Sequence, residues 1–213
     1  MPKIVDHEAR RKELAEAAWR VIRREGLEGA SVRNVAKEAG MSLGSLRHYF
    51  ATQSELLAFS MRMVGERVKE RIKKLEMTGD IRADFERIIE ETLPLDDERV
   101  SESIVWLGFV GKALVDESLG ELAAEIHEAL YGLFRKLADA LIRFGSCRPD
   151  ADAELEARRL HALVDGLVVH ALTNPRSVDP DTIRRTIAYH LSGLLPERSD
   201  AQDKRPGNDR SGT

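Results

Sequence analysis

Apolar residues recur every three or four positions along most of the chain, which is the period of amphipathic α-helices. The first such stretch begins near Asp6, a candidate helix cap, and stops at Gly26. Its apolar face consists of Leu14, Ala18, Val21 and Ile22. Proline is sparse, and Ala, Leu, Glu and Arg dominate long stretches, so helix is favoured nearly throughout. The pattern predicts an all-α fold of about nine helices.

Two short helices follow, joined by a tight turn. Ser31 is placed to cap the first, and Gly40 supplies the left-handed backbone conformation that ends it. Ser42 caps the second, which extends from Leu43 to about Phe50. Two short helices separated by a glycine turn are the arrangement of a helix-turn-helix, in which the second helix enters the DNA major groove.

Longer helices make up the rest of the chain. Thr52 to Glu55 is a capping box that starts a helix extending to about Met77, a span of roughly 38 Å. A second capping box, Ser118 to Glu121, starts a helix that runs out at Gly145. Further apolar faces predict helices around Phe85–Ile89 and Ile104–Phe109, from Ala153 to about Leu172, and from Asp179 to Leu195.

These patterns divide the chain into three parts. Residues 1–52 form the predicted helix-turn-helix DNA-binding domain, and the long helix joins it to a helical regulatory and dimerisation domain at residues 53–196. The tail, residues 197–213, contains no large apolar residue and cannot repay the entropy cost of ordering, so we expect it to be disordered.

Charge is distributed unevenly along the chain. The net charge of -4 would argue against nucleic acid if it were spread uniformly. Residues 1–50, however, hold ten Lys and Arg against seven Asp and Glu, about +3, which leaves about -7 for the remainder. The basic end therefore coincides with the predicted helix-turn-helix.

Cysteine usage and hydropathy indicate the compartment. The single Cys147 cannot form a disulfide within the chain, and no charged-then-apolar leader precedes the first helix. No apolar run approaches the roughly eighteen residues that a membrane span needs. We expect a cytoplasmic protein that does not associate with membranes.

Residues 10–60 resemble the signature of the TetR family. The resemblance lies in Ala36 to Leu46, His48 to Phe50 and Glu55 to Leu57. The stretch from Leu46 to Phe50 is further similar to the branch that has a BetI-type regulatory domain. The resemblance implies a ligand-responsive transcriptional repressor that binds a palindromic operator in double-stranded DNA as a homodimer, with no cofactor or metal.

The predicted DNA contacts lie on and around the second short helix. Gly44 would let the backbone approach the duplex closely, and Arg33 has the two-pronged donor geometry that suits guanine. Tyr49 and Phe50 point about 100° apart, and Phe50 is the better candidate for the core. The full predicted set is Ser31, Arg33, Ser42, Leu43, Gly44, Ser45, Arg47, His48, Tyr49 and Gln53.

Two of these positions depart from the residues usual in the family. Arg47 stands where the family usually has tyrosine, and Gln53 stands where it often has lysine. Gln53 can donate to a phosphate only without charge assistance, so that contact should be weaker and less sensitive to salt. Ser31 and Ser42 can be explained as helix caps, with or without an added DNA contact. We expect tight binding to require the dimer.

Aromatic, methionine and histidine residues of the second part are candidates for an effector pocket. His127 and Tyr131, one helical turn apart, bring polar groups to the same place. An apolar or amphipathic effector suits such a lining, and a choline-like cation would suit the face of Trp106. Residues of these types are also common in ordinary cores. The predicted pocket consists of Met61, Met63, Trp106, Phe109, His127, Tyr131 and Phe134.

The last two helices carry a broad apolar stripe that fits a four-helix dimer seam. A two-fold dimer would place the recognition helices roughly 34 Å apart, one turn of DNA. His170 and His190 could instead be core or surface residues. The predicted interface consists of Leu163, Gly166, Leu167, His170, Ile183, Ile187, His190 and Leu194.

Two other classes of protein were weighed. His127-Glu128 starts like the helix of a zinc protease, but Tyr131 stands where the second histidine must be, so we expect neither a metal site nor an enzyme. A helical scaffold protein would use the same apolar faces, but it would not need a helix-turn-helix.

Overall fold

The protein is all-helical in the part of the chain that the structure describes, which confirms the predicted fold class. The computed structural model describes residues 7–144, 147–148 and 150–194. Within these ranges it has nine α-helices, one 3-10 helix and no strand. Their bounds are α1 His7–Gly29, α2 Val32–Glu38, α3 Leu43–Arg47, α4 Gln53–Lys74, α5 Ile81–Glu90, α6 Asp97–Ala113, η1 Glu117–Leu119, α7 Gly120–Arg143, α8 Ala153–Thr173 and α9 Pro180–Ser192.

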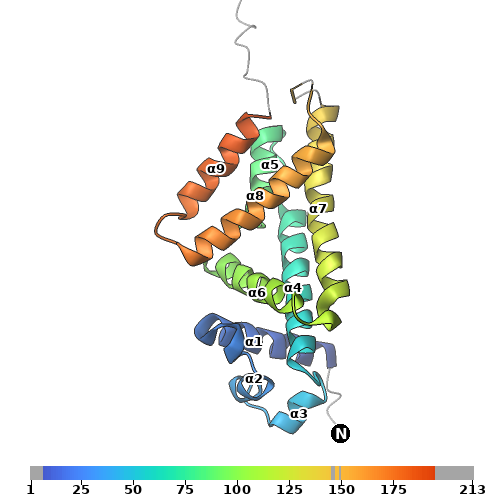
Figure 1. The fold of residues 1–213 in the computed structure, drawn as a ribbon, viewed down its shortest axis with the longest axis vertical. Helices are drawn as coiled ribbons and strands as arrows, with labels where there is room; N and C mark the ends of the chain where they lie inside the picture. The colour runs from blue at the N-terminus through green and yellow to red at the C-terminus, as the bar shows by residue number, and fades with distance from the viewer. Residues whose placement is uncertain (1–6, 145–146, 149, 195–213) are drawn as a thin grey trace, which may run out of the picture.

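The helices form an elongated molecule with a small end and a large end. Figure 1 shows α1, α2 and α3 grouped at one end, from which α4 leads into the larger part built from α5 and α7 to α9. We call α1 to α3 the head. Helix α6 lies between the two parts and packs on α1, α4 and α8.

The turns of the head follow the predicted capping pattern. Ser31 Oγ accepts a hydrogen bond from the Asn34 amide at 3.2 Å, and Ser42 Oγ accepts one from the Ser45 amide at 3.1 Å. Gly40 has a φ of 63°, the left-handed conformation expected of the turn residue. These local signals explain why the two short helices begin and end where they do.

The start of α4 is also capped as predicted. Thr52 Oγ1 accepts from the Glu55 amide at 3.1 Å, and the Glu55 carboxylate accepts from the Ala51 amide at 2.8 Å. Helix α3 is shorter than predicted because the amides of Tyr49 and Phe50 both bond to the Leu46 carbonyl, which tightens the chain into a turn after Arg47.

Several predicted helix ends need correction. Helix α1 continues through Gly26, which has a φ of 74° and forms a kink instead of a stop. The predicted capping box at Ser118 to Glu121 is wrong: Asp116 caps η1 through the Ser118 amide at 3.1 Å, and α7 follows without a side-chain cap. The predicted cap Asp179 is confirmed, since its carboxylate accepts from the Thr182 amide at 2.8 Å.

Other predictions concern residues outside the described ranges. These are the helix start near Asp6, the helix ends at Gly145 and Leu195, and the disordered tail 197–213. Among the described residues, none of the helices combines the length and apolar character needed to cross a bilayer.

Buried side chains form two apolar clusters. The first joins the head to α4 and also takes in Val105 and Phe109 of α6, Leu119 of η1 and Leu122 of α7. The second joins α5, α7, α8 and α9 at the large end. Trp106 is half-buried and packs against both clusters. The first cluster therefore crosses the predicted boundary at residue 53.

Candidate DNA-binding surface and effector cavity

The predicted DNA contacts lie together at the small end of the molecule, on α2, α3 and the first turn of α4 (Figure 1). Arg33, Gly44, Ser45, Arg47 and His48 are exposed, as is the cap residue at position 42. The remaining predicted contacts are half-buried: Ser31, Leu43, Tyr49 and Gln53. Side chains and backbone of α3 are thus open to a partner.

Arginines of the head fall into a paired group and an unpaired group. Arg20 and Arg24 of α1 bond to Glu38 at 2.8 and 3.1 Å, and these hydrogen bonds lower the pKa of Glu38. Arg33 and Arg47 make no ion pair with any described residue. Because an unpaired guanidinium has its donors free, these two arginines provide positive charge for phosphates and base edges.

The environment of Gly44 is open. A Cβ atom added there would meet only Ser42 Oγ, at 3.9 Å, which is ordinary van der Waals contact. No contact within the protein therefore requires glycine at this position. A requirement for glycine would have to come from a partner that approaches the α3 backbone closely.

The two aromatic residues after α3 differ as predicted. Phe50 is fully buried, and its ring lies 5.4 Å from that of Phe59. The Arg11 guanidinium lies over both rings, at 4.9 and 4.6 Å from their centroids. Tyr49 is half-buried and its ring contacts that of His7 at 5.4 Å. Arg11 and His7, both in α1, were not predicted to contact these rings, because no local sequence signal links α1 to α3.

A cavity of about 360 Å³ lies among α4, α6, α7 and α8. Of the predicted pocket residues, Met61 and Trp106 line it. Phe109 and Phe134 are instead fully buried in the two apolar clusters. The other three do not line this cavity: Met63 packs against the first cluster, His127 is exposed, and Tyr131 packs against the second cluster.

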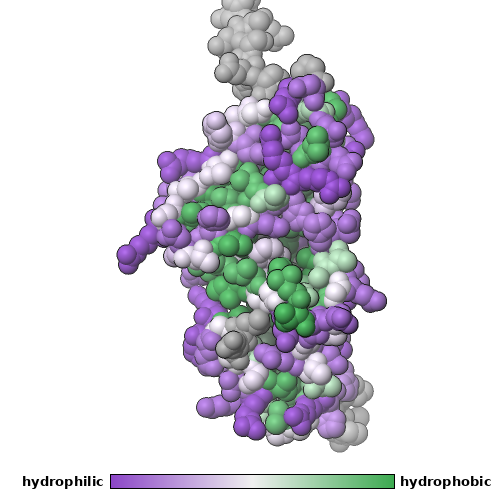
Figure 2. Space-filling model, viewed as in Figure 1, coloured by the Kyte–Doolittle hydropathy of each residue, from purple (hydrophilic) through white to green (hydrophobic). Residues whose placement is uncertain are grey.

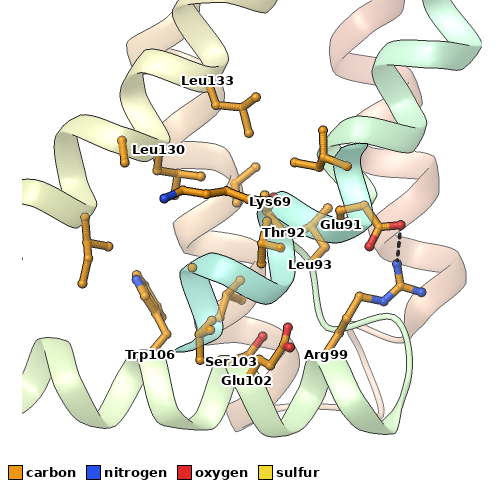
Figure 3. Close-up of a pocket in the computed structure, with 18 of the residues that line it drawn as sticks. Lys69, Glu91, Thr92, Leu93, Arg99, Glu102, Ser103, Trp106, Leu130 and Leu133 are labelled. Atoms are coloured by element: carbon orange, nitrogen blue, oxygen red, sulfur yellow. Dashed lines mark ion pairs between the residues drawn. The ribbon is translucent and has the colours of Figure 1, made fainter. Parts of the chain in front are cut away.

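The cavity wall is mostly apolar, with polar groups at particular places. Figure 3 shows Trp106 and Ser103 of α6, Thr92 and Leu93 of the loop after α5, and side chains of α7 directed to the same space. Most of this lining was not predicted from the sequence. The apolar residues outside the predicted set are Val64, Val68, Ile72, Leu93, Ile126, Ala129, Leu130, Leu133, Val164 and Val168.

A charged network closes one side of the cavity. Arg71 of α4 donates to both oxygens of Glu102, at 2.9 and 2.7 Å, and to the Glu91 carboxylate at 2.7 Å. Arg99 lies 3.7 Å from the other Glu91 oxygen, as the dashed line in Figure 3 marks. The hydrogen bonds that Arg71 donates to Glu102 are the largest cause that raises the pKa of Arg71. The network ties α4 to α6 and to the loop after α5.

Asp165 of α8 supplies a second polar region of the lining. Burial raises the pKa of Asp165 and lowers the pKa of its neighbour His161, whose Nε2 lies 3.6 Å from the carboxylate. The His127 ring lies 4.7 Å from that of His161, and neither histidine lines the cavity. Within the described residues, no lysine or arginine pairs with Asp165.

The predicted dimer residues divide between the core and the surface. Ile183, Ile187 and Leu194 are fully buried in the protomer, and Leu167 is nearly so, because these apolar positions of α8 and α9 pack inward on α5 and α7. They have no surface left for a second protomer. The predicted residues that keep accessible surface are Leu163, Gly166, His170 and His190.

A helix-turn-helix with exposed, unpaired arginines, joined by one long helix to a cavity-bearing helical part, defines the class of one-component DNA-binding regulators. Residues 14–68 match the family described as bacterial regulatory proteins, tetR family, and residues 81–196 match the BetI-type transcriptional repressor, C-terminal. The chain belongs to the TetR family of bacterial transcriptional regulators, with a BetI-type regulatory domain. It is a transcriptional regulator and not an enzyme.

Individual relatives agree with this assignment. The chain is 42% identical over 206 residues to the HTH-type transcriptional regulator PksA of Bacillus subtilis, covering 96% of this chain and 99% of the relative. It is 31% identical to the HTH-type transcriptional regulator BetI of Yersinia pestis, covering 78% and 83%. A crystal structure of a transcriptional regulator from Saccharomonospora viridis in complex with choline is similar with a TM-score of 0.80, at 25% identity, covering 89% and 99%.

Proposed function

We propose that the chain is a ligand-responsive repressor that binds a palindromic operator as a homodimer in the cytoplasm, with DNA affinity set by a small molecule in the cavity. The observation that carries this proposal is the exposed, unpaired pair Arg33 and Arg47 beside the open backbone of Gly44. This combination suits base edges and phosphates, and no described residue forms an ion pair with either arginine.

Helix α4 connects the cavity to the head. Its residues from Met61 to Lys73 contribute to the cavity wall, and its first turn begins directly after the turn that ends α3. A ligand that occupies the cavity presses on α4, and any displacement of α4 reaches the recognition helix. The ligand regulates the protein if it binds unequally to the DNA-bound and free arrangements of the head.

The lining favours an apolar or amphipathic effector. Trp106 and Asp165 both line the cavity, and no described lysine or arginine pairs with the Asp165 carboxylate, so a positively charged head group that lies against the indole and the carboxylate, away from Lys69 and Lys73, would be stabilised. The Saccharomonospora viridis relative was solved with choline, which makes choline the first compound to test.

The dimer seam in this proposal lies on the outer faces of α8 and α9. Figure 2 shows apolar side chains gathering over α6 and α8, between hydrophilic ends of the molecule. Leu163 and Gly166 of α8 are half-buried, and Tyr189 of α9 is 83% exposed, an unusual exposure for a tyrosine. A second copy packed here would cover these residues.

DNA binding is tested by gel shift with fragments from upstream of the protein's own gene and its neighbours. We expect specific binding that Arg47→Ala and Tyr49→Ala each abolish. Arg62→Ala is the matched control, since Arg62 pairs with Glu125 on the surface away from α3. If the wild-type chain binds none of these fragments even at low salt, the proposal is wrong.

Effector binding is tested by thermal shift with choline, larger amphipathic amines and apolar carboxylic acids. We expect at least one amine to raise the melting temperature, and Trp106→Ala or Asp165→Asn to remove that shift. A shift by the acids alone would contradict a cationic effector. Light scattering tests the seam, and a stable monomer would contradict it.

A further inference from the structure

One contact joins the residue that caps η1 to the first turn of α4, which follows the recognition helix. Ser54 Oγ, in the first turn of α4, donates to Asp116 Oδ2 at 2.5 Å, across 62 positions of sequence. Both side chains are half-buried. Within the described residues, no other hydrogen bond or ion pair joins Asp116 to α4 or to the head.

The two oxygens of Asp116 have separate partners. Oδ1 accepts from the hydroxyl of Ser118 at 2.6 Å and from the Ser118 amide at 3.1 Å, which caps η1 locally. Oδ2 is left for Ser54. Hydrogen bonds from Ser118 and from Ser54 lower the pKa of Asp116, so the carboxylate is charged and both bonds are charge-assisted.

The surroundings of Asp116 hold it in a fixed position. Three residues later, Leu119 is buried in the first apolar cluster, and Leu122 of α7 is buried with it. Helix α7 goes on to line the cavity through Ile126 and Leu130. Asp116 therefore stands just before η1, which leads directly into a helix that lines the cavity, and it bonds to the first turn of α4, the helix that follows α3.

We propose that Asp116 is a positioning residue for DNA binding: its bond to Ser54 fixes the orientation of the head, and so the spacing of the two heads in the dimer. This inference rests on the proposed function. Two heads that are already oriented lose less conformational freedom when both enter their half-sites. A single half-site needs only one head, so its affinity does not depend on the contact.

The test uses the full-length protein and the operator duplex that the wild-type chain selects from a random library. Ser54→Ala removes the contact with Asp116, and Ser54→Thr keeps a hydroxyl there. Ser118→Ala is the matched control, because it removes a serine hydroxyl from the same carboxylate without crossing to α4. We expect Ser54→Ala to weaken binding to the full operator by about three- to tenfold. Binding to a single half-site at low salt should be unchanged.

A second measurement needs no DNA. Spin labels at Lys37→Cys of α2 and Lys136→Cys of α7, in a Cys147→Ser background diluted with unlabelled protein, report the orientation of the head. Both lysines are exposed. We expect Ser54→Ala to broaden the distance distribution, and Ser54→Thr and Ser118→Ala to retain the wild-type one.

Each outcome decides the proposal. Equal behaviour of Ser54→Ala and Ser118→Ala in both measurements overturns it, as does broadening without a loss of full-operator affinity. An equal loss on the half-site assigns Ser54 to folding or to direct DNA contact and overturns the proposal as well. If the wild-type chain selects no operator, the proposed function fails, and the spin-label distances alone then show whether the contact orients the head.

Discussion

At the scale of single residues, Arg33 and Arg47 of the proposed DNA surface are exposed and make no ion pair with a described residue. Glu38 is occupied by Arg20 and Arg24 on the α1 side, which leaves Arg33 and Arg47 without a described carboxylate partner. The Glu38 carboxylate thus offsets positive charge at Arg20 and Arg24 but not at Arg33 or Arg47.

Gly44→Ala separates folding from DNA binding. The added methyl group has room, and alanine favours helix over glycine by up to about 1 kcal/mol, so we expect unchanged or raised stability to urea. We also expect clearly weaker operator binding, because the methyl group would stand between α3 and the duplex. Ser101→Ala, at a half-buried position near the start of α6, serves as the control. Unchanged DNA affinity in Gly44→Ala would show that the duplex does not approach this backbone.

Which residues could be predicted from sequence depends on how local their signals are. The caps Ser31, Ser42 and Asp179 were predicted because a cap and its amide lie within three residues. Phe109 and Phe134 were assigned to a pocket but lie in the core, since periodicity places an aromatic on an apolar face without saying whether that face meets a cavity.

At the scale of helices, the contacts that organise the cavity join distant parts of the sequence. Arg71 and Glu102 are 31 positions apart, and their pairing follows only from the crossing of α4 and α6. No motif marks such a pair in advance. The fold class and most helix bounds were therefore predictable, while most of the cavity lining was not.

Arg71→Leu should be strongly destabilising. It leaves the Glu102 side chain, which is only 5% exposed, as a buried charge without its partner, at a cost of about 3 kcal/mol in the free energy of unfolding. Urea denaturation measures this change. The exposed pair of Arg62 and Glu125 is the comparison, and Arg62→Leu should cost less than about 1 kcal/mol. Equal losses of stability in Arg71→Leu and Arg62→Leu would contradict the importance of burial. Adding Glu102→Leu to the Arg71→Leu variant should restore part of the lost stability.

Helix α9 introduces a dependence of stability on pH. Burial, with a smaller effect of Arg159, lowers the pKa of His190 to about 4. The unfolded chain protonates this histidine near pH 6.5, so between about pH 6.5 and 4 the unfolded state binds more protons than the folded one. The stability that neutral His190 contributes is complete above about pH 6.5 and is lost as the pH falls through this window.

His190→Gln should therefore reduce the loss of stability between pH 7 and pH 5. Urea unfolding at the two pH values measures it, and His170→Gln, at an exposed position on α8, is the matched control. Burial also lowers the pKa of His161, so part of the pH dependence should remain. An identical pH dependence in both variants and the wild type would contradict the assignment to His190.

At the scale of the whole molecule, a basic end is joined to an acidic remainder in a chain with a net charge of -4. Phosphates are attracted to the head and repelled by the rest, so binding should be oriented and sensitive to salt. The proposed dimer would present two heads, and their combined binding would let a chain with few cations at its DNA surface reach high affinity.

Operator affinity measured against salt concentration tests this arrangement. Arg47→Ala should reduce the slope of log affinity against log salt by about two, because each dimer carries two copies. Gln53→Lys should change the slope in the opposite direction and tighten binding at low salt. Identical slopes for these two variants would show that neither position faces a phosphate.

The first apolar cluster limits how heads can be exchanged between related regulators. Val105, Phe109, Leu119 and Leu122 of the regulatory part belong to the same apolar cluster as the buried residues of the head. If residues 1–52 were replaced by those of a relative, the apolar residues of the new head would pack against α6, η1 and α7 residues from a different protein. Hybrid regulators should therefore inherit new operator specificity intact only when the inner faces of α6, η1 and early α7 are transplanted with the head.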